Sequence, residues 1–350
     1  MSNNSRSEIW LIIDSLTFGG IESYVLELAK GLKSHQIPVF VWLVRDYRAS
    51  PPLCELLEKH NIDYGFLSQR SFASLPTLIY KIQKYRPLAI HAHGYKASLL
   101  AKMARMLTGC RQISTYHAGE TAEGVLRIYD GLDRYSAFIS SASLTVSNQI
   151  QARIPFSTQY LNNFIDTTQV SESSGNQIAF VGRLSKEKAA DRFLQLAQKH
   201  PTKNFDIYGT GNEERTLKQA ASDNVTFHGH QTNMNQVWES VGFLIICSRF
   251  EGLPMTALEA MARGIIVISL DIGNLSKLIS HQKNGFIYDN FEQLCRDFST
   301  IQTLPHHQLI EIKRSAQQTI QDDFSQQALI PQLLKIYHSN SVQSDYQFDK

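Results

Sequence analysis

Residues 247–268, CSRFEGLPMTALEAMARGIIVI, carry the most informative pattern in the chain. An apolar run at 241–246 precedes them and predicts a buried strand. Pro254 then opens a segment whose apolar residues recur at helical spacing, which predicts a helix that begins near this proline. Gly264 follows at a position typical of a left-handed helix end, and a second apolar run starts at 265. The stretch therefore predicts strand, loop, helix and strand, a unit of a parallel α/β sheet.

Two carboxylates bracket the start of that helix. Glu251 lies in the loop, and Glu259 lies about a turn and a half inside the helix. At about 1.5 Å rise per residue their head groups could lie on the order of 10 Å apart, beside N–H groups that a helix start offers to an anion. This spacing fits a sugar nucleotide, which is an anion with a hydroxyl-bearing group at each end. It equally fits a carboxylate that stabilises the helix start and a second one on a solvated face.

The residue identities add a resemblance. The string EGLPMTALEAMARG resembles the E-x7-E signature of the retaining, GT-B-fold glycosyltransferases of the group 1 type. The matching positions are Glu251, Gly252, Pro254, Glu259, Ala260, Ala262 and Gly264. In that family the first glutamate lies against the donor sugar and the second binds the ribose. The resemblance therefore implies donor contacts for Glu251 and Glu259, and for Gly252, Leu253 and Pro254 between them.

Length and composition fit two globular domains. The chain has 350 residues, of which 43% are hydrophobic and 19% charged. We predict a first Rossmann-like domain at 1–167, a second at 168–322, a helix at 323–339 that crosses back to the first, and a tail at 340–350. The resemblance implies the GT-B fold, in which two Rossmann-like domains face each other across a cleft. No apolar run reaches the roughly 20 residues that span a bilayer, and the first one is too short for a secretory signal, so we expect a cytoplasmic protein.

The sequence offers no pattern for a metal or a cofactor. The four cysteines are widely spaced, without a C-x-x-C pair, and are expected to be free thiols. No two aspartates stand two residues apart, so the D-x-D motif by which another glycosyltransferase fold holds a metal is missing. We predict that neither a metal nor a cofactor is bound, and that protein cations neutralise the diphosphate.

Two cations follow a predicted strand at 177–181. Arg183 and Lys188 stand beyond Gly182, where charge-assisted contacts could offset a diphosphate. The family resembled here uses an arginine and a lysine at these positions. Ala189 stands where that family has a glycine. Without the resemblance, both cations would be ordinary surface charges.

Other segments are assigned to the donor by the same resemblance. A glycine pair opens the first helix, a Gly-Thr-Gly turn follows a strand near 205, and an HGH string ends the next strand. None of them forms a complete G-x-G-x-x-G dinucleotide fingerprint. In the family these segments face the donor, shape its cleft and hold the nucleobase through backbone groups. The implied donor-binding residues are Gly19, Gly20, Gly209, Gly211, His228, Gly229 and His230.

Histidines follow two strands of the first domain. His117, in STYHAGE, stands just past a strand end, where open α/β sheets bind ligands. The string resembles the T-x-H segment of the same family, whose histidine lies near the donor sugar, so His117 is a candidate catalytic residue. His91 and His93 are weaker candidates for acceptor contacts. The string YLNNFID resembles the N-G-V-D segment of the family, with Asn163 in place of its glycine.

Positive charge is concentrated in the first domain. Residues 1–165 carry a net charge of +5 and residues 166–350 carry −3, and residues 64–119 contain no acidic side chain. The basic residues of that segment are Arg70, Lys81, Lys84, Arg86, Lys96, Lys102, Arg105 and Arg111. An anionic membrane surface is the partner that such a segment predicts, and a solvated face is the alternative. Nucleic acid is not expected, because no aromatic interleaving or binding motif accompanies the charge.

The helix that begins at Tyr95 contributes to this basic segment. Its pattern predicts a buried apolar face of Leu99, Leu100, Met103 and Leu107. Lys96, Lys102 and Arg105 would then lie on its other faces.

We therefore predict a retaining, metal-independent hexosyltransferase. It would move a sugar from a nucleotide-diphosphate sugar, a UDP-sugar by preference, to a glycan or lipid-linked acceptor in cell-surface polysaccharide synthesis. In this interpretation Arg183, Lys188 and the helix start at Pro254 stabilise the departing diphosphate, Glu251 steadies the sugar, and Glu259 holds the ribose. Three alternatives stay open: a sugar-nucleotide 2-epimerase of the same architecture, a dinucleotide-dependent oxidoreductase, and a non-catalytic nucleotide-sugar-binding subunit.

Overall fold

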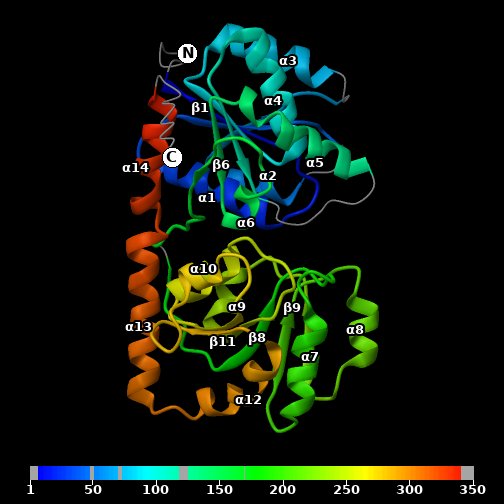
Figure 1. Ribbon diagram of the computed structural model, residues 1–350, viewed down its shortest axis with the longest axis vertical. Helices are drawn as coiled ribbons and strands as arrows, with labels where there is room; N and C mark the ends of the chain where they lie inside the picture. The colour runs from blue at the N-terminus through cyan, green and yellow to red at the C-terminus, as the bar shows by residue number, and fades with distance from the viewer. Residues whose placement is uncertain (1–6, 48–50, 70–72, 118–124, 169, 340–350) are drawn as a thin grey trace, which may run out of the picture. The chain divides into compact units, whose positions relative to one another are not determined.

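The structure is a computed structural model in which the chain divides into two compact units (Figure 1). It describes residues 7–47, 51–69, 73–117, 125–168 and 170–339. Unit 1 comprises Met1–Val146, Ile150–Leu161 and Leu329–Lys350, and unit 2 comprises Ser147–Gln149 and Asn162–Ala328.

Unit 1 is built on a parallel sheet with the strand order β3-β2-β1-β4-β5-β6-β7. The strands are β1 (Ile9–Ile13), β2 (Val39–Leu43), β3 (Asp63–Phe66), β4 (Ala89–His93), β5 (Gln112–Tyr116), β6 (Ala142–Thr145) and β7 (Gln159–Tyr160). The helices between them are α1 (Gly20–Ser34), α2 (Pro52–Lys59), α3 (Ser74–Tyr85), α4 (Tyr95–Thr108), α5 (Val125–Tyr135) and the short η3 (Ala137–Ile139). The strand order reverses beside β1 and β4, which is where open parallel sheets bind ligands at their carboxyl ends.

Unit 2 repeats this plan with the strand order β10-β9-β8-β11-β12-β13. Its strands are β8 (Gln177–Val181), β9 (Phe205–Tyr208), β10 (Val225–Gly229), β11 (Val241–Ile246), β12 (Ile266–Leu270) and β13 (Phe286–Tyr288). Its helices are α7 (Ala190–Lys199), α8 (Glu214–Ala220), α9 (Met234–Ser240), α10 (Met255–Ala262), α11 (Leu275–Leu278), α12 (Phe291–Gln302) and α13 (His306–Asp323). Two parallel, Rossmann-like sheets confirm the predicted fold class.

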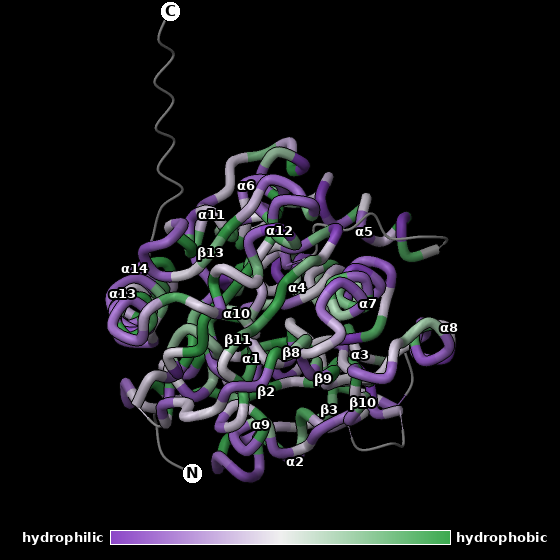
Figure 2. The backbone as a smooth tube through the Cα atoms, turned by 90° about the horizontal axis from the view of Figure 1, so that it is seen from below, coloured by the Kyte–Doolittle hydropathy of each residue, from purple (hydrophilic) through white to green (hydrophobic). Residues whose placement is uncertain are grey.

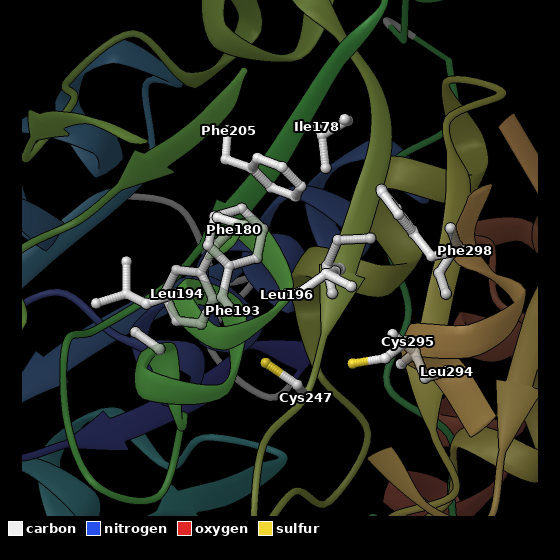
Figure 3. Close-up of a cluster of buried hydrophobic side chains, with 14 of the residues drawn as sticks. Ile178, Phe180, Phe193, Leu194, Leu196, Phe205, Cys247, Leu294, Cys295 and Phe298 are labelled. Carbon is white, nitrogen blue, oxygen red and sulfur yellow. The ribbon is translucent and has the colours of Figure 1, made fainter. Parts of the chain in front are cut away.

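Apolar side chains fill both faces of the second sheet, because its central strands β8, β11 and β12 are almost continuously hydrophobic. Figure 2 shows β8 and β11 as hydrophobic segments of the chain. On one face the rings of Phe180, Phe193, Phe205 and Phe298 pack with centroid separations of 5.4 to 5.9 Å (Figure 3). The free thiol of Cys247 lies in the same cluster. None of the helices in the described part of the chain is long and apolar enough to cross a bilayer.

The chain passes between the units four times. It enters unit 2 at Ser147–Gln149, where the short α6 (Asn148–Gln151) begins, and returns to unit 1 at Ile150. It joins unit 2 again at Asn162, a few residues before the predicted boundary at 168, and there the backbone N–H of Ile165 donates to the carbonyl of Phe324. At the last crossing, α14 (Gln326–His338) leaves unit 2 and continues as part of unit 1, where Tyr337 is fully buried.

Helix α4 buries a different face from the predicted one. Met103 and Leu107 are 50% and 64% exposed, so the prediction that they face the sheet is wrong. The buried face instead carries small side chains, those of Ala97, Ala101 and Ala104, which pack in one cluster with bulky residues of the sheet. Large residues on the strands require small ones on the helix, and this complementarity cannot be seen in the periodicity of one helix.

Lys102 of α4 is also buried, although its charge predicted a solvated position. Its ammonium contacts a carboxylate oxygen of Asp133 on α5 at 2.6 Å, and its side chain is 2% exposed. The hydroxyls of Ser98 and Tyr116 complete this network, Ser98 donating to Asp133 and Tyr116 accepting from Lys102. Burial lowers the pKa of Lys102 and raises that of Asp133, so both groups depend on each other to remain charged.

We predict that Lys102→Met destabilises unit 1 by about 3–5 kcal/mol, because it leaves the Asp133 carboxylate buried without its partner. Urea unfolding measures the loss. The double variant K102M/D133L should recover most of it, since no buried charge remains. K218M, which removes the exposed ion pair between Lys218 and Glu214 on α8, is the matched control and should cost less than about 1 kcal/mol. Equal losses in K102M and K218M would contradict the prediction.

Candidate active site

Glu251 and Lys188 meet at the carboxyl end of the second sheet. The ammonium of Lys188 lies 2.6 and 2.9 Å from the two carboxylate oxygens of Glu251, and the Ser248 hydroxyl donates to one of them at 2.8 Å. The Glu251 side chain is only 7% exposed, whereas that of Lys188 is 28% exposed. The carboxylate is therefore fixed by its neighbours, while the ammonium can still reach a ligand.

The two loops that carry this pair are joined along their backbones. The N–H of Arg249 donates to the carbonyl of Glu187 at 2.7 Å, and the Arg249 side chain binds both carboxylate oxygens of Asp191. These contacts hold the loop after β8 against the loop after β11, so Lys188 and Glu251 meet although 63 residues separate them.

Arg183 occupies the same loop as Lys188 and is exposed. The pKa of the nearby Glu187 carboxyl is lowered, first by hydrogen bonding from Ser185 and its own backbone, then by the charges of Arg183 and Lys188. Both predicted cations therefore act on one region beyond β8.

The turn after β9 packs directly on this loop. Gly209 has a φ of +136°, and a Cβ there would overlap the carbonyl oxygen of Gly182. A Cβ on Gly211 would likewise overlap the carbonyl oxygen of Leu184. The two glycines are thus required for close backbone approach and support the loop that carries Arg183.

The HGH string lies beside that turn. The carbonyl of Gly229 accepts from the N–H of Gly209 at 2.8 Å. The His228 ring stacks on Tyr208, with centroids 4.4 Å apart, and its Nε2 lies 2.7 Å from a carboxylate oxygen of Asp206. His230 is exposed. The structure therefore brings residues 228–230 next to the 209–211 turn.

Helix α10 begins at Met255, directly after Pro254, and Gly264 has the predicted left-handed conformation, with a φ of +66°. Glu259 is half-buried on this helix, where the indole N–H of Trp238 on α9 donates to its Oε2 at 3.1 Å. Arg263 donates to the backbone carbonyl of Glu259 and to the side chain of Asn235, which joins α9 to α10. Helix α9 thus contributes to the orientation of the Glu259 carboxylate.

Three residues that position the Glu251 loop were not predicted. The Asn163 side chain donates to the carbonyl of Leu253 at 2.6 Å, and the N–H of Asn274 donates to the carbonyl of Gly252 at 2.8 Å. Gly273 has a φ of +65°, and a Cβ there would overlap the carbonyl oxygen of Glu251. Asn163, noted in the sequence as a departure from the family pattern, was the one available signal.

The predicted residues of unit 1 form a separate group. Nε2 of His117 lies 3.1 Å from Nδ1 of His93, and its ring packs edge-on against Tyr24 of α1. His91 is buried between the hydroxyls of Tyr337 and Thr115, at 2.7 and 2.6 Å, which is unsuited to an acceptor contact. Burial lowers the pKa of His91 and of His117 to about 3, so both rings are neutral at pH 7.

The glycine pair of unit 1 lies at the start of α1. Gly19 and Gly20 are exposed, and the N–H of Gly19 donates to the carboxylate of Glu22 at 3.0 Å. The Glu22 carboxylate thus caps the N-terminus of α1. Among the residues that the structure describes, no group of three or more His, Cys, Asp or Glu side chains is arranged to hold a metal ion.

Comparison with known proteins matches the sequence to two glycosyltransferase family models, which cover different parts of the chain. The model of "Glycosyl transferases group 1" matches residues 164–314, and that of "Glycosyltransferase Family 4" matches residues 18–169. An uncharacterized glycosyltransferase of Haemophilus influenzae is 29% identical over 39% of this chain and 42% of its own length. The O-antigen biosynthesis glycosyltransferase WbnH of Escherichia coli is 33% identical over 33% of this chain and 34% of its own length. The matched stretch thus spans less than half of these curated relatives.

Solved structures agree in fold. Anabaena Alr3699/HepE, solved in complex with UDP-glucose, superposes with a TM-score of 0.80 and 18% identity, over 94% of this chain and 98% of that one. The two family matches together extend from residue 18 to residue 314. The chain belongs to the group 1 glycosyltransferases of GT-B fold, which confirms the predicted family.

We predict that unit 1 loses stability as the pH falls from about 6.5 toward 3. Unfolded histidines bind a proton near pH 6.5, whereas the buried His91 and His117 remain neutral, so protons favour the unfolded chain by up to about 1.4 kcal/mol per pH unit and histidine. Urea unfolding between pH 7.5 and 4.5 measures the slope. His117→Gln should reduce it, and His306→Gln, on the exposed start of α13, should not. Equal slopes in all three proteins would refute the assignment.

Proposed function

We propose that this chain is a retaining glycosyltransferase that transfers a hexose from a UDP-sugar to a glycan or lipid-linked acceptor in cell-surface polysaccharide synthesis. The observation that carries the proposal is the contact between Lys188 and Glu251, beside the start of α10. Its support is family membership, a relative named for O-antigen biosynthesis, and a similar fold solved with UDP-glucose. We place the reaction in the cytoplasm, at the inner face of the membrane.

In this proposal the diphosphate binds to the exposed part of the Lys188 ammonium, to Arg183 and to the N-terminus of α10. Each charge-assisted contact contributes roughly 1.5–3 kcal/mol. These contacts strengthen as negative charge develops on the departing phosphate oxygen, so they lower the barrier more than they stabilise the bound donor. Protein cations would supply this stabilisation without a metal.

Glu251 would face the hexose. Lys188 and Ser248 hold its carboxylate in one orientation, which suits the stabilisation of an oxocarbenium-like carbon. The bond between the anomeric carbon and the diphosphate oxygen breaks, and the acceptor oxygen bonds to the same face of that carbon. The departing phosphate oxygen takes the acceptor proton. The same-face course is what the family resemblance implies.

The remaining donor contacts are assigned by position. Glu259 would accept hydrogen bonds from the ribose hydroxyls, and residues 228–230 would hold the nucleobase. His117, neutral through burial, would serve the donor sugar as a hydrogen-bonding group without a positive charge. Gly19 and Gly20 complete the proposed donor contacts from unit 1.

Isothermal titration of the intact chain with UDP-sugars, GDP-sugars and free UDP tests the donor class. We expect binding of UDP and at least one UDP-hexose, with no dependence on a chelator. NMR of the anomeric proton in the product, with an acceptor supplied, distinguishes retention from inversion. A chain that binds no nucleotide would overturn the proposal, and conversion of the UDP-sugar without an acceptor to its 2-epimer would replace it.

We predict that Glu259→Ala weakens UDP binding about tenfold or more, through loss of charge-assisted contacts to the ribose. The control is Glu214→Ala, which removes a half-buried carboxylate paired with Lys218 on α8 and should leave the affinity unchanged. Lys188→Gln should lower turnover by about 10²–10³ with a smaller effect on donor affinity. Wild-type affinity in the first variant or wild-type turnover in the second would remove the corresponding role.

Trp238→Phe should also weaken UDP binding, because it removes the N–H that orients Glu259 and keeps most of the ring volume. We expect a loss of about three- to tenfold, from one hydrogen bond of about 1 kcal/mol. The loss should vanish in the Glu259→Ala background and with 2′,3′-dideoxy-UDP, which has no ribose hydroxyls. A loss that persists in either case would show that Trp238 acts on packing alone.

A further inference from the structure

Helix α5 is oriented with its apolar face outward. Its exposed side chains are Leu126, Ile128, Tyr129, Leu132 and Tyr135, and they range from 41% to 71% exposed. Its inward face carries Asp133, bound to Lys102, while Asp130 is half-buried in an ion pair with Arg134. A helix on the surface of a globular protein ordinarily has the opposite arrangement.

Helix α4 extends this surface. Met103, Met106 and Leu107 are half or more exposed, and Met106 follows Lys102 by one helical turn, so it lies on the stripe that approaches α5. The Arg105 side chain donates to the carbonyl of Ile139, which ties α4 to η3, where Phe138 is 66% exposed. We name these exposed side chains of α4, α5 and Phe138 the α4–α5 apolar face. In Figure 1, α3, α4 and α5 follow one another along unit 1.

Half of the basic side chains in the segment predicted from sequence are engaged with other groups of unit 1. Lys102 is buried, Lys96 pairs with Asp14, and the guanidinium groups of Arg105 and Arg111 donate to backbone carbonyls. The charge of this segment therefore does not by itself form a binding surface. The apolar side chains beside it are the feature that lacks a structural explanation.

In the part of the chain that the structure describes, the unpaired charge around the α4–α5 apolar face is positive. Among the described residues from 64 to 161, the acidic side chains are Asp130 and Asp133, and both are held in ion pairs. Arg127 is exposed on α5, and Lys84 and Arg86 are exposed on α3, which packs beside α4. An apolar surface with positive charge around it complements an anionic bilayer. A twofold dimer would instead place the like charges of both copies against each other.

We propose that the α4–α5 apolar face lies on an anionic bilayer. Its aliphatic side chains enter the boundary between headgroups and acyl chains, its tyrosines lie at headgroup level, and Arg127, Lys84 and Arg86 contact lipid phosphates. The buried pair of Lys102 and Asp133 holds α5 in this orientation. The inference rests on the proposed place of the reaction at the inner face of the membrane and assigns the surface that lies there, but it does not depend on which sugar is transferred.

Flotation of the intact chain with vesicles tests the proposal. We expect binding to vesicles of phosphatidylglycerol and phosphatidylethanolamine, and at least tenfold less to pure phosphatidylcholine. The double variant I128E/L132E should lose at least tenfold in vesicle-bound fraction while keeping UDP affinity and thermal midpoint. Gln308→Glu, which adds one charge on the exposed side of α13, is the control and should bind as the wild type does.

A second variant set separates charge from insertion. K84Q/R86Q should reduce binding in 0.1 M salt and weaken its salt dependence, because Arg127 is the one proposed lipid-contacting cation that remains. Tyr135→Trp should give fluorescence that brominated lipids quench. Wild-type flotation of I128E/L132E, or absence of quenching, would overturn the proposal. A wild-type dimer in light scattering that I128E/L132E converts to a monomer would overturn it too, because the face would then belong to a second copy. UDP binding reports on the proposed reaction separately from each of these outcomes.

Discussion

The contact between Lys188 and Glu251 is the constraint on which the organisation of unit 2 depends. It requires that the loops after β8 and β11 touch, although the strands that carry them are far apart in sequence. Gly209 and Gly211 make room for the backbone of the loop after β8, and Arg249 joins that loop to the loop after β11. Asn163 and Gly273 hold the backbone on the other side of Glu251. A largely buried carboxylate tolerates this position only because a cation and a hydroxyl are already oriented toward it.

Unit 1 is stabilised by a different principle. Its helix α4 presents alanines to the sheet and uses a buried lysine to hold α5. The apolar side chains of both helices are thereby directed to the surface. The contact between α4 and α5 thus relies on a buried ion pair in place of apolar side chains. Removing these two charges from water is costly unless both partners are held in place.

The sequence predicted the parallel α/β plan of both units, because continuous apolar runs alternate with helical periodicity. It also predicted that Lys188 and Glu251 share a site, since a family motif fixes both positions. It could not predict that Lys102 is buried or that Met103 is exposed, because each depends on a partner in another element: Asp133 and the bulky sheet residues. Trp238 and Gly273 were missed for the same reason, as neither stands near its partner in the chain.

The course of α14 has a practical meaning for protein engineering. A fragment ending near residue 167 would lack Tyr337, and the hydroxyl that meets the buried His91 would be lost with it. Arg111 would also lose the carbonyl of Ile336. Chimaeras that exchange the amino-terminal half between relatives must therefore take the last helix from the same parent, because unit 1 is completed by the far end of the polypeptide.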